Sequence, residues 1–152
     1  MNETKRISSL FKKLYDGSPW IDINITSVLQ NISAEQASKR VLKNCNTIWE
    51  ITNHLIDWRL NVLQRVQGKT NKTPGNNYIE TITDTSEKNW KDTLQRLSGV
   101  QKDWIEFLDK VDQSELVKVY TPNSMTYYEN IHGIIQHDVY HFGQIVLLSK
   151  QF

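Results

Sequence analysis

The chain is 152 residues long, which suits one domain spanning residues 1–152 with a core large enough to fold without disulfides. Its 18 basic and 17 acidic residues nearly cancel, so we expect neither nucleic acid nor a membrane surface as a partner. The single cysteine, Cys45, excludes an intramolecular disulfide framework, and we interpret it as a small buried apolar residue.

The first third of the chain predicts one amphipathic helix and two short helical segments. Residues Asn2–Tyr15 repeat apolar side chains at helical spacing but lack the continuous apolar run of a signal peptide. Trp20–Ile32 predicts an irregular connector that contains a short helix, and Ser33 with Gln36 has the pattern of a capping box. Because no segment reaches membrane-spanning length, the sequence predicts a cytoplasmic protein.

Three longer helical patterns follow in the rest of the chain. Asn46–Val66 carries apolar residues in steps of three and four. The polar loop Gly68–Asn77 leads to a second long helix over Thr83–Val111. The extended connector Val117–Pro122 leads to a last helix that Ser124 is predicted to cap and that runs to Lys150. Together with the first helix, these patterns predict an all-α four-helix bundle.

The last helix carries two histidines whose spacing indicates a metal site. His137 and His141 lie four residues apart, so both rings reach the same side of a helix, about one turn from each other. His54 lies near the middle of the predicted helix over Asn46–Val66, and bundles build metal sites from side chains on facing helices. The alternative is that each is a core histidine hydrogen-bonded within the protein, which for His54 would mean Glu50 or Asp57.

Two segments around these histidines resemble a known family. The run IIQHDVYHFGQI resembles the His-xxx-His-x-Gly-Gln signature of the DinB-like (YfiT-like) family of bacterial four-helix proteins. The segment NHLIDW resembles the family's earlier motif, a histidine followed four residues later by tryptophan, and GSPW and ISAEQA resemble its opening section. The resemblance implies a divalent-metal site formed by His54, His137 and His141, and homodimers are common in the family.

The family resemblance also implies two kinds of chemistry at such a site. Members include metal-dependent hydrolases and thiol-dependent S-transferases, so we expect a small-molecule substrate, which in the second case includes a low-molecular-weight thiol. Three imidazoles leave at least one position open on the metal, as catalytic zinc sites do. Imidazole suits zinc and nickel, and also copper or iron, so ligand type alone leaves the metal open.

Other residues near the three histidines are candidates for supporting roles. Their carboxyl, amide or indole groups fall on the same turns or faces of the predicted helices, where they would orient a ligating ring or line a pocket. These candidates are Glu50, Asp57, Trp58, Asp138 and Gln144. The sequence leaves hydrolysis and thiol transfer open, and it also leaves a third alternative, a non-catalytic metal-binding or stress-related bundle that acts through its dimer surface.

Overall fold

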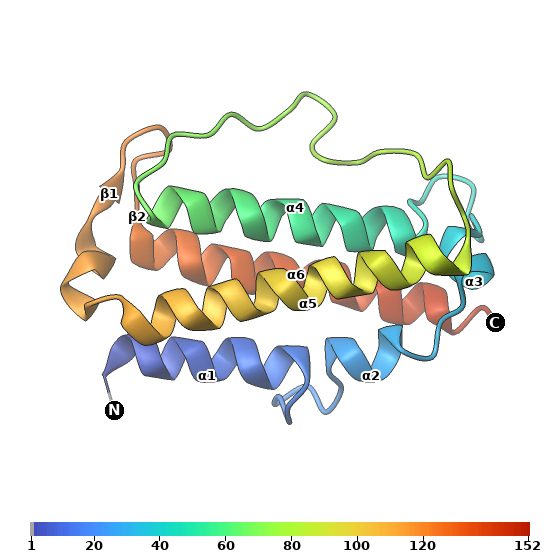
Figure 1. Cartoon of the computed structure of the whole chain (residues 1–152), viewed down its shortest axis with the longest axis horizontal. Coiled ribbons are helices and arrows are strands. Elements are labelled where there is room, and N and C mark those ends of the chain that lie inside the picture. The colour runs from blue at the N-terminus through green and yellow to red at the C-terminus, as the bar shows by residue number, and fades with distance from the viewer. Residues whose placement is uncertain (1) are drawn as a thin grey trace.

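The computed structural model describes residues 2–152 and shows four long helices packed side by side (Figure 1). The helix α1 packs against α5, the helix α4 packs against α6, and contacts between α4 and α5 join the two pairs. This arrangement confirms the predicted all-α four-helix fold. The bounds of the four helices are Glu3–Tyr15 for α1, Ile48–Val66 for α4, Glu87–Lys110 for α5 and Tyr127–Ser149 for α6.

The connectors hold the remaining short elements. Two short helices, α2 over Ile25–Leu29 and α3 over Ala34–Ser38, lie in the segment between α1 and α4, as predicted. The capping box of α3 forms with both of its hydrogen bonds. Between α5 and α6, a 3₁₀ helix over Gln113–Val117 precedes an antiparallel pair of two-residue strands, β1 over Val119–Tyr120 and β2 over Met125–Thr126. Within residues 2–152, no helix is long and apolar enough to cross a membrane.

Three of the long helices begin later than predicted, because a different residue caps each of them. Thr47 caps α4 and Thr126 caps α6, each in a capping box with a glutamate three residues on, while Ser86 caps α5. Ser124, the predicted cap of the last helix, lies instead in the turn between β1 and β2 with φ 58°, a left-handed conformation incompatible with an N-cap. The polar loop is correspondingly longer, and it runs from Gln67 to Ser86.

Tryptophans fill the centre of the bundle, and each buried indole N–H has an acceptor. Trp49, Trp90 and Trp104 are at most 2% exposed. Their Nε1 atoms donate to the Thr93 hydroxyl, to the Ile32 carbonyl and to the Arg59 carbonyl, respectively. Satisfied indoles bury a large apolar area at little polar cost, which fixes how α4 and α5 pack. Cys45, expected to be buried, is instead exposed, because it lies in the irregular turn before α4.

Candidate metal centre

The packing of α4 against α6 brings the three histidines of the predicted site together. His54 lies on α4, and His137 and His141 lie on successive turns of α6. The Nε2 atom of His54 is 3.0 Å from Nε2 of His137 and 3.1 Å from Nε2 of His141. One ligand atom from each ring lies within 4.8 Å of the others, and His54 is only 2% exposed. The three rings therefore converge on one point between the two helices.

Hydrogen bonds on the far side of two rings fix which nitrogen carries the proton. His54 Nδ1 lies 2.7 Å from the backbone carbonyl oxygen of Asn77, which can only accept, so Nδ1 is the protonated nitrogen. His141 Nδ1 likewise donates to Oε1 of Gln144 at 2.7 Å. In the neutral rings, the Nε2 lone pairs of His54 and His141 therefore point into the cluster, as metal ligation requires.

The electrostatics of the cluster favour neutral rings. Desolvation by burial is the main cause that lowers the pKa of His54 to about 4, with smaller contributions from the nearby His141 and His137. Desolvation also lowers the pKa of His141. At neutral pH both rings are unprotonated, so their facing lone pairs repel each other at 3.1 Å unless a cation lies between them. Two nitrogens on one tetrahedral zinc are separated by roughly 3.4 Å, so these residues fit a metal ion.

A buried ion pair lies beside His137, the third histidine of the cluster. Asp138 follows His137 on α6, and its Oδ2 accepts from Nε of Arg59 at 2.8 Å, with both side chains 0% exposed. Its other oxygen, Oδ1, lies 4.0 Å from Nδ1 of His137. Both of these atoms, together with Nη2 of Arg59, are buried without a hydrogen-bond partner. Of the three candidate carboxylates, Asp138 is thus the one that the fold places beside a histidine of the cluster.

The other two carboxylates, Glu50 and Asp57, are paired with groups other than the three histidines. Glu50 accepts from the backbone N–H of Thr47 and from Arg40, so it belongs to the capping box that starts α4. Asp57 is 3.5 Å from Arg96 of α5. Neither orients His54, because the Nδ1 position of that ring is taken by the Asn77 carbonyl. The alternative in which Glu50 or Asp57 bonds His54 is therefore wrong, since helical spacing alone does not tell which way a carboxylate turns.

Trp58 and the loop above it close one side of the cluster. The ring centroid of Trp58 lies 5.8 Å from that of His137 and 5.6 Å from that of Tyr78, and its Nε1 donates to the side-chain oxygen of Asn77. Asn77 and Tyr78 both have left-handed backbone conformations, with φ 53° and 59°. Sequence reasoning missed this contribution of the loop. The one indication in the sequence was the asparagine at position 77, because asparagine tolerates the left-handed region better than most residues.

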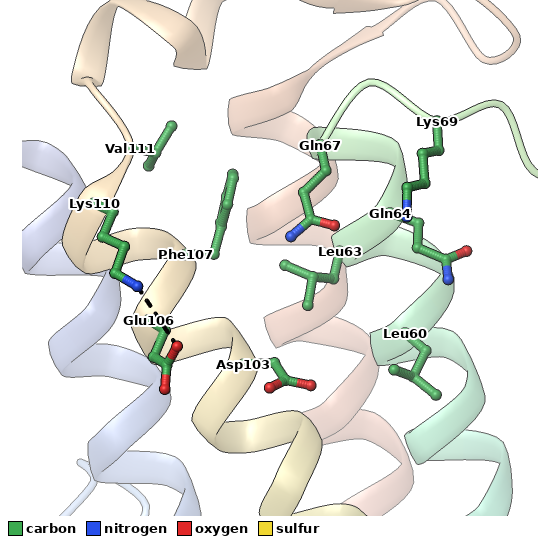
Figure 2. Close-up of a pocket in the computed structure, with 10 residues that line it drawn as sticks. All are labelled: Leu60, Leu63, Gln64, Gln67, Lys69, Asp103, Glu106, Phe107, Lys110 and Val111. Atoms are coloured by element: carbon green, nitrogen blue, oxygen red, sulfur yellow. Dashed lines mark ion pairs between the residues drawn. The ribbon is translucent and has the colours of Figure 1, made fainter.

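The cavities of the molecule show where a small molecule has room. One cavity, of about 560 Å³, lies between the C-terminal halves of α4 and α5. Figure 2 shows the residues that line it, among them Glu106 and Lys110, which form an ion pair. None of the three histidines lines it. A smaller cavity of about 200 Å³ is lined by His137 and Trp58, and so adjoins the three-histidine cluster.

Comparisons with known proteins agree with this geometry. The model of the DinB superfamily matches residues 24–145, which include all three histidines of the cluster. No curated protein and no solved structure matches the chain significantly.

Proposed function

We propose that this chain, which belongs to the DinB superfamily, binds one divalent metal ion through His54, His137 and His141 and uses it to act on a small molecule. The observation that carries the proposal is that Nε2 of His54 lies within 3.1 Å of Nε2 of both His137 and His141, and that His54 and His141 each hold their proton on Nδ1. Zinc and nickel are the ions that this set of imidazoles suits best.

The chain's own residues supply the placement that such chemistry needs. A bound ion would lower the pKa of a thiol or a water molecule at the position that three protein ligands leave open. Asn77 and Gln144 hold the rings of His54 and His141 in their ligating tautomers. Trp58 packs against the rings of His54 and His137 on the side of the loop.

Among the reactions open to such a site, the surroundings favour thiol-dependent transfer over hydrolysis. A hydrolase of this type commonly uses a free carboxylate as the base for its water molecule. Among residues 2–152, the one carboxylate within 4.0 Å of a histidine nitrogen is that of Asp138, which is 0% exposed and paired with Arg59 through Oδ2. A thiol has a pKa near 8.5 and needs no such base once it is bound to a cation. We therefore place an S-transferase first.

Metal binding is tested by titration of the purified, chelator-treated protein. We expect one zinc or nickel ion per chain by isothermal titration and elemental analysis. Changing His137→Ala should abolish stoichiometric binding and leave the helical circular dichroism intact. His132→Ala is the matched control, because His132 lies on the same helix, contacts the ring of Tyr128 and is outside the cluster. Equal binding by wild type and the His137 variant would refute the site.

The reaction class is tested with cobalt in place of the native ion. A transferase should bind 2-mercaptoethanol at the cobalt and show a sulfur-to-metal charge-transfer band, and it should consume the thiol when an electrophile such as 1-chloro-2,4-dinitrobenzene is added. Ester hydrolysis with a rate that rises around pH 7, and no thiol band, would favour a hydrolase instead. A loaded ion that neither azide nor thiol can reach would leave metal binding without catalysis as the function.

A further inference from the structure

The cavity beside the metal centre has apolar walls and one arginine. It lies between α4 and α6 next to the β1–β2 turn, has a volume of about 200 Å³ and includes His137 in its lining. Trp58, Val62 and Ile134 form its apolar walls. At roughly 30 Å³ per water molecule, the cavity holds the equivalent of about seven waters, which is room for a short organic group.

Arg65 lines the same cavity and is held there by aromatic rings. Its guanidinium carbon is 5.3 Å from the ring centroid of Trp58 and 5.3 Å from that of Tyr120, one ring on α4 and the other on β1. The Tyr120 hydroxyl is in turn fixed by a hydrogen bond from the backbone N–H of Asn71. These contacts restrict the side chain without using its N–H donors, so the guanidinium is positioned before any ligand arrives.

The positive charge of Arg65 is not neutralised by the protein. Within residues 2–152, no carboxylate lies within 4.0 Å of it, and its Nε atom is buried without a hydrogen-bond acceptor. The other charged side chain of the lining, Glu129, accepts from the backbone N–H and the hydroxyl of Thr126 at the start of α6. A guanidinium without a counter-ion beside an apolar cavity favours an anionic ligand, because hydrogen bonds between charged partners are stronger than those between neutral ones.

We propose that this cavity is a carboxylate subsite for the substrate of the metal centre, and that Arg65 is its specificity-determining residue. This inference rests on the proposed function in one respect, because the reacting end of the substrate is taken to lie at the proposed metal site. A carboxylate matches the planar fork of one arginine, with two parallel N–H···O bonds. The uncharged part of the ligand then lies along Trp58 and Ile134, which directs its other end toward His137. The substrate class is a short carboxylic acid with a reactive or thiol-bearing end.

The first experiment probes the subsite without any metal, so it does not depend on the metal centre. Butyrate and butyramide have the same shape and differ in charge. Titrated into the metal-free protein and followed by the indole N–H resonances in NMR, butyrate should bind at least about tenfold more tightly than butyramide, the amount expected for a charge-assisted pair. Equal affinities for the acid and the amide would overturn the proposal.

Variants then assign the preference to Arg65. Arg65→Gln should remove the preference for butyrate and leave the weak binding of butyramide unchanged, while Arg65→Lys should keep only part of it because the planar fork is lost. Arg96→Gln, at an exposed arginine on α5, is the matched control and should bind like the wild type. If Arg65→Gln is poorly folded, the lysine variant alone decides. Full preference in the lysine variant would show that the carboxylate binds elsewhere or by charge alone, and would refute the assignment.

A second experiment connects the subsite to the metal centre. On zinc-loaded protein, 3-mercaptopropionate should bind at least about tenfold more tightly than 3-mercaptopropionamide, and Arg65→Gln should cancel the difference while it still binds one zinc per chain. Failure to bind zinc would refute the proposed function and leave the butyrate result standing. Zinc binding with no acid preference in either experiment would refute the subsite alone.

Discussion

The buried pair of Arg59 and Asp138 predicts a large and asymmetric response to mutation. Both side chains are 0% exposed, and among residues 2–152 the one further side chain that hydrogen-bonds Arg59 is Gln101, whose Oε1 lies 2.9 Å from Nη1. Asp138→Asn keeps the shape of the side chain but leaves a cation in the core without its counter-ion. Breaking such a pair from one side costs about 3–5 kcal/mol, roughly a fifth or more of the stability of an ordinary domain.

Replacing both partners should cost much less. In the double variant Arg59→Met, Asp138→Leu, no charge is left in the core, and apolar groups of similar size fill the space. The amide of Gln101 loses its partner, so we expect a residual cost of about 1–2 kcal/mol relative to wild type. The double variant should therefore be more stable than Asp138→Asn, although it differs from wild type at two buried positions.

Urea unfolding in the presence of a chelator measures these differences without a contribution from bound metal. With a slope of about 2 kcal/mol per molar urea, Asp138→Asn should lower the midpoint by about 2 M. Asp92→Asn, at the exposed pair with Lys88, should leave the midpoint unchanged. A loss below about 1 kcal/mol for Asp138→Asn, or a double variant no more stable than the single one, would contradict the reasoning from burial.

Three further predictions concern the centre and the surface. Gln144→Leu should weaken zinc binding by about 10–100-fold in a competition titration, because His141 loses the acceptor of its Nδ1–H, and the exposed Gln136→Leu should not. The metal-free protein should lose stability in urea as pH falls from about 6.5 toward 4, because the unfolded chain binds a proton that folded His54 resists, with its pKa lowered to about 4; a flat profile would contradict this. We also propose a homodimer through the exposed apolar side chains of α6, so Tyr140→Glu should shift the mass in light scattering toward the monomer.

The sequence predicted the bundle and the three histidines because both depend on helical periodicity. When the apolar faces of α4 and α6 pack together, few arrangements of the two helices are possible. The spacing of His137 and His141, and the position of His54 near the middle of α4, then bring the three rings toward one another. Gln144 was found for the same reason, since it lies one turn beyond His141. Periodicity carries this information because it fixes direction around a helix axis.

The parts that could not be predicted depend on loops and on competition between polar groups. Asn77 holds His54 through a backbone carbonyl, which every residue has, so no residue type marks it. Glu50 has the right spacing to reach His54, but the N-terminus of α4 has unpaired N–H groups that compete for the same carboxylate, and the capping box forms instead. The pattern Thr47-x-x-Glu50 was readable in the sequence and is the better guide at that position.

The long loop between α4 and α5 divides the chain into two parts, each of which supplies one helix to each packed pair (Figure 1). A cut at Thr83, in its exposed irregular stretch, would leave His54 and Asn77 in the first fragment and His137 and His141 in the second. Neither fragment contains a complete pair of packed helices, so each alone would expose the apolar faces that now meet. Mixed together, the two fragments are expected to reassemble around the core, and an ion at the proposed site would strengthen that association because its ligands come from both fragments. The proposed site would thus make the chain a scaffold for metal-dependent fragment complementation.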